Sequence, residues 1–278
     1  MGVACPGLRS VGLRVDAVSV SAFWADRFMN RIVQGLWIGS ELSRMEHLSI
    51  SAFLKSGYEY HLYVYDDVKN IPRGTIVKDG GEILSPSLIF QYKHHKSYSG
   101  FSNLFRYKLL LEKGGWWVDS DLICLKPFDF VEDYVFSSER ACGQQFINCG
   151  AIKAPVGSDI LSFVWDNART KDPAKLVWGE IGPKLLGQAV REFSLEEYVQ
   201  PYYVFCPIGY ADWADILDPS SSMDFGEATY AVHLWNEIWR RNGQDKNRTY
   251  DPACLYEKLK RYFCDSKEEC VPAQEIIE

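Results

Sequence analysis

The sequence of 278 residues contains no long uninterrupted apolar segment. No window approaches the roughly 18 apolar residues of a membrane-spanning helix, and the stretch 11–24 is broken by Arg14 and Asp16. Residues 1–28 also do not have the layout of a secretion signal, because no clear small-residue cleavage site follows the interrupted apolar part. We therefore expect no spanning helix and a cytoplasmic location, with peripheral association at a membrane face left open.

An excess of basic residues is also missing. The chain has 30 Lys and Arg against 37 Asp and Glu, which gives a formal net charge of −7 at pH 7. A negative overall field repels polyanions, so nucleic acid is not expected as a partner. An anionic ligand would have to be held by local basic groups or by a metal ion.

The eight cysteines lack the spacings typical of zinc sites and redox pairs. They include no C-x-x-C pair and no Cys/His zinc pattern. We expect most of them to be free thiols that pack as small apolar side chains. Cys264 and Cys270, which flank a short polar segment, could form a disulfide in an oxidising compartment.

What the sequence does contain is an alternation of strand and helix patterns. Residues 31–38 are typical of a buried strand, residues 41–55 of a helix, and residues 58–65 of a second strand that stops at Asp66 and Asp67. This order indicates an α/β domain, and 47% hydrophobic residues are ample for one large core.

The remainder of the chain continues the pattern. Residues 71–97 show no sustained period and are expected to form loops with short elements, including the basic run 93–96. Ser102 or Asn103 is expected to cap a helix that ends at Gly114 and Gly115. The further expected elements are strands at 116–125, 146–154 and 202–206 and helices at 158–167 and 183–193.

Two acidic residues interrupt the apolar segment WWVDSDLICL. In an extended chain, residues i and i+2 point to the same side, so Asp119 and Asp121 would direct two carboxylates toward one point. Their repulsion favours a shared cation, and oxygen ligands of this kind suit Mn²⁺ or Mg²⁺ bound together with phosphate groups. The pattern is short, and the alternative is that both carboxylates cap a turn or face solvent.

The segment around this pair, GFSNLFRYKLLLEKGGWWVDSDLICLKP, resembles the core motif of the DXD-containing retaining glycosyltransferases. That group includes α-1,4-galactosyltransferases, initiating mannosyltransferases and clostridial glucosylating toxins. The positions that match the motif in register are Arg106, Leu110, Gly114, Gly115, Asp119 and Asp121. Further similarity lies in RIVQGLWIG, YEYHLYVYDD, FINCGAIKAP and AVHLWN, so that the resemblance spans residues 30–239.

The resemblance implies a GT-A type fold, a single Rossmann-like domain with a mixed sheet. We assign residues 30–265 to this domain, residues 1–29 to an N-terminal extension and residues 266–278 to an acidic tail. The implied activity is metal-dependent transfer of a sugar, with retention at the anomeric carbon, from a nucleotide-diphosphate donor to a hydroxyl of a saccharide acceptor. A UDP-sugar is the favoured donor, and polysaccharide or glycoconjugate synthesis is the expected context.

The resemblance also implies roles for individual residues. Those expected at the donor are Gln34, Leu36, Trp37, Asn103, Arg106, Trp117, Asp119 and Ser120. Those expected to act in catalysis are Asp119, Asp121, Arg106 and Asn148. His233 is expected to join Asp119 and Asp121 as a ligand of Mn²⁺ or Mg²⁺. The residues expected at the acceptor are Trp178, Glu180 and Trp235.

Two positions depart from the family pattern. Asn103 stands where the family usually has an aspartate that bonds the transferred sugar, and Trp117 stands where it usually has a tyrosine. Asparagine can still donate and accept hydrogen bonds, but it lacks the charge of aspartate, which weakens any assignment of the donor sugar.

Two alternative functions stay open. One is a catalytically inactive nucleotide-sugar-binding protein of the same fold, although such a protein would be expected to lose a metal carboxylate. The other is a phosphotransferase of the haloacid dehalogenase type, whose D-x-D continues with Thr or Val near the start of the chain, whereas Leu122 follows here at mid-chain.

Overall fold

A computed structural model describes residues 31–223 and 225–265. The predicted N-terminal extension, the predicted acidic tail and Cys270 lie outside the described residues, so the domain boundaries and the disulfide stay predictions. Within residues 31–223 and 225–265, no helix is both long enough and apolar enough to cross a membrane.

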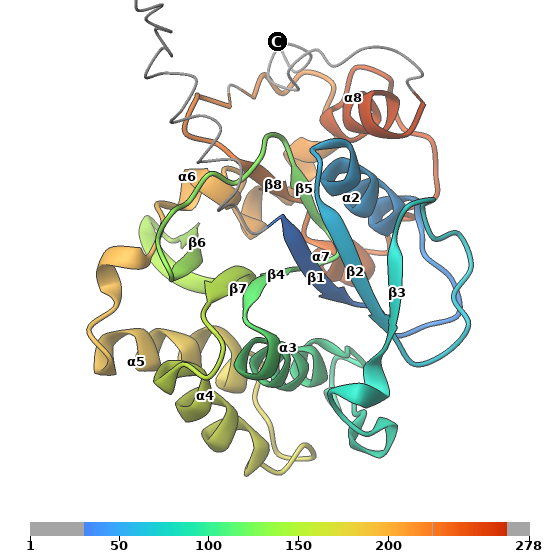
Figure 1. Ribbon diagram of the computed structural model, residues 1–278. Coiled ribbons are helices and arrows are strands. Elements are labelled where there is room, and N and C mark those ends of the chain that lie inside the picture. The colour runs from blue at the N-terminus through green and yellow to red at the C-terminus, as the bar shows by residue number, and fades with distance from the viewer. Residues whose placement is uncertain (1–30, 224, 266–278) are drawn as a thin grey trace, which may run out of the picture. The chain divides into compact units, whose positions relative to one another are not determined.

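The centre of the described region is a six-stranded sheet (Figure 1). In spatial order its strands are β3 (Ile76–Asp79), β2 (Glu59–Val64), β1 (Ile32–Leu36), β4 (Gly115–Val118), β7 (Gln144–Ala154) and β6 (Val135–Ala141). The first four are parallel to one another, and β7 runs antiparallel to both of its neighbours. The predicted α/β class with a mixed sheet is confirmed, and the arrangement is consistent with a GT-A type fold.

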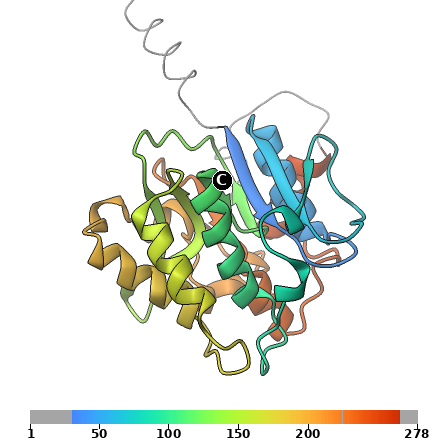
Figure 2. The same ribbon diagram turned by 60° about the horizontal axis from the view of Figure 1, so that its bottom comes forward.

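Helices cover both faces of this sheet (Figures 1 and 2). One face carries α2 (Arg44–Lys55), α6 (Tyr202–Phe205) and α8 (Leu255–Lys260), and the other carries α3 (Ser99–Lys113), α4 (Asp159–Arg169) and α5 (Leu185–Glu192). The remaining helix is α7 (Asn236–Arg241), and short helical turns occupy Gly80–Glu82, Pro86–Leu88, Glu180–Lys184, Glu196–Tyr198, Tyr210–Ile216 and Arg261–Asp265.

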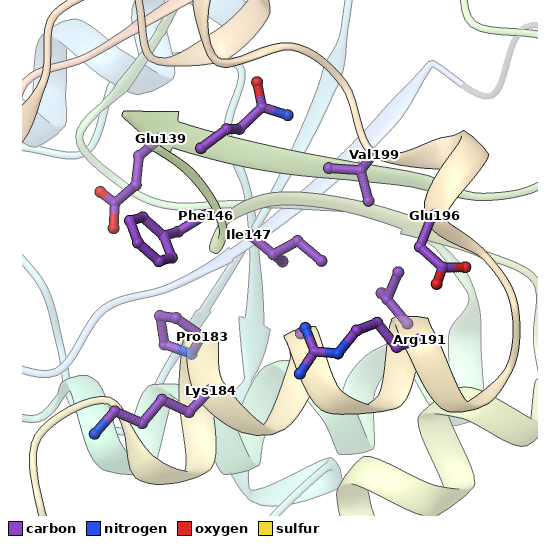
Figure 3. Close-up of a pocket in the computed structure, with 11 residues that line it drawn as sticks. Glu139, Phe146, Ile147, Pro183, Lys184, Arg191, Glu196 and Val199 are labelled. Atoms are coloured by element: carbon purple, nitrogen blue, oxygen red, sulfur yellow. The ribbon is translucent and has the colours of Figure 1, made fainter. Parts of the chain in front are cut away.

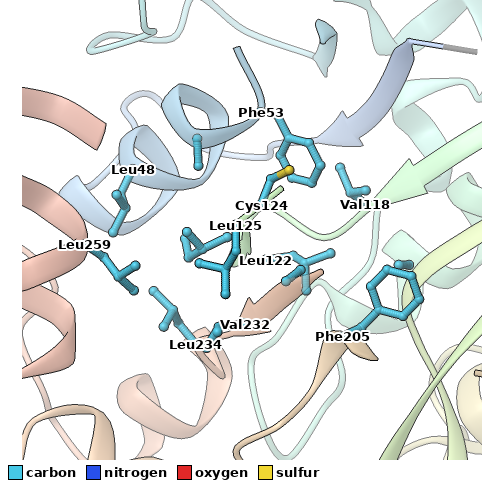
Figure 4. Close-up of a cluster of buried hydrophobic side chains, with 14 of the residues drawn as sticks. Leu48, Phe53, Val118, Leu122, Cys124, Leu125, Phe205, Val232, Leu234 and Leu259 are labelled. Carbon is cyan, nitrogen blue, oxygen red and sulfur yellow. The ribbon is translucent and has the colours of Figure 1, made fainter. Parts of the chain in front are cut away.

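A second, two-stranded sheet packs into the core on the α2 side. It consists of β5 (Leu122–Cys124) and β8 (Ala231–His233), which run antiparallel. Figure 4 shows Leu122 and Val232 of these strands among apolar side chains from α2 and α8, such as Phe53 and Leu259. Because β5 and β8 are completely buried, the residues at their ends are held by a rigid core.

Local sequence explains where the two long helices begin and end. Ser43 and Glu46 form a reciprocal capping box at the start of α2. Helix α3 ends at Gly114, which has a φ of 62°. Gly114 also lies close to the segment that follows β7, and a Cβ at this position would come within 2.7 Å of the backbone nitrogen of Val156. The predicted cap at Ser102 or Asn103 is wrong, because α3 already begins at Ser99.

Three further predictions need correction. The predicted strand 116–125 is divided by a turn at residues 119–121 into β4 and β5, which belong to different sheets. The predicted strand at 202–206 is wrong, since α6 forms there; a short apolar run does not distinguish a buried strand from a helical turn. Strand β6 has no counterpart among the predicted elements.

The connectivity indicates where a ligand should bind. From β1 the chain moves outward through β2 and β3, and α3 then returns it to β4 on the opposite side of β1. In open α/β sheets, ligands bind beyond the carboxyl ends of the strands at such a switch in direction. Asp119 follows the carboxyl end of β4, and Trp37 follows that of β1.

Candidate active site

Three side chains that can bind a metal meet beside the end of β4. Asp119, Asp121 and His233 each offer a ligand atom, and these atoms all lie within 4.8 Å of one another. The two aspartates belong to the turn between β4 and β5, and His233 is brought to them because β8 pairs with β5, with His233 opposite Leu122. The structure thus brings together the three residues predicted as metal ligands. In the sequence, His233 lies 112 residues after Asp121 and 114 residues after Asp119.

Asp121 is the more tightly held of the two aspartates. Its Oδ1 lies 3.0 Å from Nε2 of His233, and its Oδ2 accepts a hydrogen bond of 2.7 Å from the backbone N–H of Asn236 at the start of α7. Burial disfavours the carboxylate, but the charge of His233 and these hydrogen bonds lower the pKa of Asp121. Burial likewise disfavours a charged imidazole, yet Asp121 raises the pKa of His233 well above 6.5. Without a cation, a proton on His233 therefore balances Asp121.

Asp119 is held from the opposite side. Its Oδ1 accepts a hydrogen bond of 2.9 Å from the indole N–H of Trp117 and lies 3.1 Å from a guanidinium nitrogen of Arg106. Its backbone N–H donates to the carbonyl oxygen of Gly150 at 2.8 Å. Burial raises the pKa of Asp119, and the positive charge of Arg106 limits this rise. Asp119 therefore keeps one oxygen engaged with the protein and is 26% exposed.

Arg106 acts as a support for Asp119 in this structure. The guanidinium donates to the carbonyl oxygen of Cys149 and, at 2.9 Å, to the hydroxyl of Ser102, and it lies 4.7 Å from the ring centroid of Trp117. Its side chain is only 4% exposed. The predicted Arg106 thus lies in the site, where its fixed position orients a carboxylate that could bind a metal.

The donor set of the three residues fits a divalent metal ion. Two carboxylates and one imidazole offer oxygen and nitrogen ligands of the kind that divalent metal ions accept. Two carboxylates that repel each other and converge with an imidazole are the arrangement expected of a cation site.

Asn148 lies next to this cluster in a bulge of β7. The pairing of β6 and β7 shifts between Phe136 and Ser138, so residues 148–151 bulge from the sheet. Within the bulge, Oδ1 of Asn148 accepts from the hydroxyl of Ser137 and, at 3.1 Å, from the N–H of Gly150. The amide of Asn148 donates to Sγ of Cys206 at 3.1 Å.

The bulge is close to two of the three candidate metal ligands, Asp119 and His233. A Cβ at Gly150 would lie 3.5 Å from Oδ1 of Asn148, 3.7 Å from Cε1 of His233 and 3.9 Å from Oδ2 of Asp119. The sequence-based prediction included Asn148 but missed the supporting Ser137 and Gly150. A Gly inside the strand pattern FINCGAIKA was the available signal, since such a glycine often marks a bulge or a close approach.

The residues predicted at the donor separate into two groups. Trp37 is half-buried at the end of β1, donates its indole N–H to the carbonyl oxygen of Glu41 at 3.0 Å, and has Nζ of Lys246 at 5.4 Å from its ring. Ser120 lies in the turn between the two aspartates. By contrast, Gln34 holds the end of α3 through a 2.8 Å hydrogen bond to the carbonyl oxygen of Gly114, and Leu36 belongs to the apolar core.

Asn103 is positioned by a close approach of the chain. It is 6% exposed and lies on α3 one turn before Arg106. Gly182 passes so near that a Cβ there would come within 2.5 Å of Nδ2 of Asn103. Asn103, which stands where the family usually has an aspartate, thus faces the backbone at Gly182, where there is no room for a side chain.

The three residues predicted at the acceptor are engaged in other contacts. Trp235 packs 4.2 Å from the ring of His233 and donates to the carbonyl oxygen of Ile208, so it supports the imidazole. Trp178 lies 4.0 Å from the guanidinium of Arg241. Glu180 pairs with Lys171 at 2.9 Å and accepts a hydrogen bond from the backbone of a neighbouring turn.

Two protein-family models match parts of the chain. Residues 45–140 match the glycosyltransferase sugar-binding region containing DXD motif, and residues 174–268 match the alpha 1,4-glycosyltransferase conserved region. The first match contains Asp119 and Asp121, and the second contains His233. No curated protein matches the chain.

Several solved structures have a partial likeness to the chain. The PaToxG glycosyltransferase is 18% identical with a TM-score of 0.45, over 65% of this chain and 77% of that one. The apo-form glycosyltransferase GlyE of Streptococcus pneumoniae TIGR4 is 15% identical with a TM-score of 0.35, over 63% and 46%. The catalytic domain of alpha-toxin from Clostridium novyi is 9% identical with a TM-score of 0.31, over 90% and 84%. Two glycosyltransferase family models, one of them for the sugar-binding region that contains the DXD motif, thus match separate parts of the chain.

Proposed function

We propose that the protein transfers a sugar from a nucleotide-diphosphate donor, with a UDP-sugar favoured, to a hydroxyl of a saccharide acceptor. The reaction depends on Mn²⁺ or Mg²⁺ and retains the configuration at the anomeric carbon. The single observation that carries the proposal is the convergence of Asp119, Asp121 and His233 at the switch point of the sheet. The retaining outcome and the UDP donor rest on the resemblance to the family.

The residues that would hold the metal are Asp119, Asp121 and His233. When bound, the cation supplies positive charge beside the donor diphosphate, where negative charge develops as the bond to the anomeric carbon breaks. The protein keeps both carboxylates in place before the donor arrives. Arg106 and Trp117 fix Asp119, while Asn236 fixes Asp121.

The donor site follows from the neighbours of this cluster. Trp37 offers a half-buried ring on which a nucleobase can stack at the end of β1. Asn103 and Asn148, which lie on α3 and in the bulge of β7, are the amides that would bond sugar hydroxyls. Such a site binds and orients the donor, and the attacking hydroxyl then has to reach the anomeric carbon from the remaining open side.

The alternatives are less well supported. An inactive sugar-binding protein has no need for two carboxylates and an imidazole around one point, and all three are present. The matches to two glycosyltransferase family models favour a glycosyltransferase over the phosphotransferase alternative. A role in polysaccharide or glycoconjugate synthesis and a place in the cytoplasm, at a membrane face or away from one, stay predictions.

The test is a panel of donors in the presence of Mn²⁺. Nucleotide release is measured from UDP-glucose, UDP-galactose, UDP-N-acetylhexosamines, UDP-xylose and GDP-mannose, and UDP binding is measured by calorimetry with and without EDTA. Asp121→Ala removes one metal ligand, and Asp166→Ala, an exposed aspartate of α4, serves as the matched control.

We expect release from one UDP-sugar that falls by at least about a hundredfold in Asp121→Ala and is unchanged in Asp166→Ala. We also expect UDP binding to require the metal. Binding of neither UDP nor Mn²⁺ by the wild-type protein would refute the proposal.

A further inference from the structure

A cavity lined by residues of β6, β7 and α5 includes none of the residues assigned to the donor or the metal. It has a volume of about 710 Å³, within the roughly 300–1,000 Å³ of small-molecule sites. Figure 3 shows it between the β6–β7 hairpin and α5, with Phe146 and Ile147 above and Pro183, Lys184 and Arg191 below.

Both walls of the cavity lead into the candidate active site. On the hairpin side, Ile147 is followed directly by Asn148, whose side chain lies beside Gly150 and the metal cluster. On the helix side, Pro183 is preceded directly by Gly182, which approaches Asn103. The cavity is therefore bounded by the neighbours of the two asparagines that are proposed to bond the donor sugar.

Glu139 provides a further link between the cavity and the cluster. It lies opposite Phe146 in the pairing of β6 and β7, and both line the cavity. Burial raises the pKa of Glu139, and the positive charge of His233 opposes this rise. Within the described part of the chain, its side chain makes no hydrogen bond and no ion pair. A half-buried carboxyl without a partner is available to accept hydrogen bonds from a ligand.

The cavity lining suits a neutral ligand with polar and apolar faces. Lys184 and Arg191 contribute two positive charges, and Glu139 and Glu196 contribute two negative charges, so the formal charge of the lining is zero. A lining with no net positive charge does not favour binding of the negatively charged nucleotide diphosphate. The ring of Phe146 is 47% exposed, and the C–H face of a sugar ring can cover such a surface while its hydroxyls reach the charged groups at the rim.

We propose that this cavity binds the saccharide acceptor, with Phe146 as the stacking surface and Glu139 as the hydrogen-bond acceptor that orients the attacking hydroxyl. The proposal rests on the proposed transferase function. It places the acceptor between the hairpin and α5, whereas the sequence had indicated Trp178, Glu180 and Trp235. An acceptor held here would approach the donor sugar along the bulge of β7.

The proposal is tested by binding, which does not require turnover. The full-length protein, fluorescently labelled, is applied with Mn²⁺ and UDP to an array of neutral and acidic oligosaccharides, and the best ligand is then titrated by calorimetry. The variants are Phe146→Ala and Glu139→Gln. Leu88→Ala is the matched control, because Leu88 is 51% exposed and lies in the turn Pro86–Leu88, outside the cavity. Thermal melting and UDP affinity are measured for every variant.

We expect the wild-type protein and Leu88→Ala to bind a neutral oligosaccharide. Phe146→Ala should bind it about tenfold more weakly and Glu139→Gln severalfold more weakly, both with unchanged UDP affinity and melting temperature. Equal glycan binding by Phe146→Ala and wild type would overturn the proposal, as would wild-type protein that binds UDP and Mn²⁺ but no oligosaccharide. Glycan binding that depends on Phe146 without any UDP binding would support the cavity and refute the transferase function.

Discussion

Replacing Arg106 with methionine should destabilise the metal-free protein by about 3 kcal/mol. Removing one partner of a buried ion pair costs roughly 3–5 kcal/mol, and the lower end applies because the Asp119 side chain is 26% exposed while that of Arg106 is 4% exposed. Methionine keeps an apolar side chain of similar length, so the loss comes mainly from the charge left on Asp119, from the unpaired carbonyl oxygen of Cys149 and from the lost contact of the guanidinium with Trp117.

A double-mutant cycle separates these two contributions. In an Asp119→Asn background the carboxylate charge is absent, so Arg106→Met should cost only about 1.5 kcal/mol, which leaves a coupling of roughly 1.5 kcal/mol between the two residues. The measurement is urea unfolding in EDTA, followed by tryptophan fluorescence. A coupling below about 0.5 kcal/mol would show that Arg106 does not stabilise the charge of Asp119 and would refute the positioning role.

Two further predictions concern the metal and the donor. Asp121 raises the pKa of His233 above 6.5, so His233 carries a proton in the metal-free protein. A metal ion must displace this proton to bind the imidazole. The affinity for Mn²⁺ should therefore increase as the pH rises from about 6 to 8. Calorimetry in buffers of different ionisation enthalpy should detect the released proton, and pH-independent affinity would contradict the prediction. Gly182→Ala should lower the free energy of unfolding by about 1–3 kcal/mol and weaken donor binding, because its Cβ would lie 2.5 Å from Nδ2 of Asn103. Gly226→Ala is the control, since a Cβ at Gly226 meets open space, and it should change neither property. Thermal melting and UDP-sugar titrations measure the two effects.

Much of the fold was predictable because its signals are local. Hydrophobic patterns located β1, α2, β2 and α3 to within a few residues, and a glycine pair located the end of α3. What local patterns could not show is that Val118 and Leu122 belong to different sheets. The apolar run continues through both, and only the pairing of β5 with a strand more than 100 residues later divides it.

The same division explains why the aspartates converge. The prediction that Asp119 and Asp121 share a site is supported by the geometry, but the reason given for it is wrong, since they occupy a turn rather than one extended strand. The turn places each carboxylate against a different support: Arg106 on α3 holds Asp119, and His233 on β8 holds Asp121. Motif resemblance indicated the aspartates as well as Arg106 and His233, whereas the contact of each support with its carboxylate depends on packing and strand pairing that the sequence does not show.

The bulge of β7 joins the two halves of the proposed reaction. The carbonyl oxygens of Cys149 and Gly150 receive hydrogen bonds from Arg106 and from the backbone of Asp119, so the bulge sets the position of the metal-binding carboxylate. The strand that leads into this bulge carries Phe146 in the wall of the neighbouring cavity. One irregular segment thus fixes both the cluster where the leaving group would be stabilised and the direction from which an acceptor would approach. The hydrogen bond from Asp119 to Gly150 continues the antiparallel pairing of β4 with β7, whereas Arg106 contacts the carbonyl oxygen of Cys149 where β7 departs from its pairing with β6.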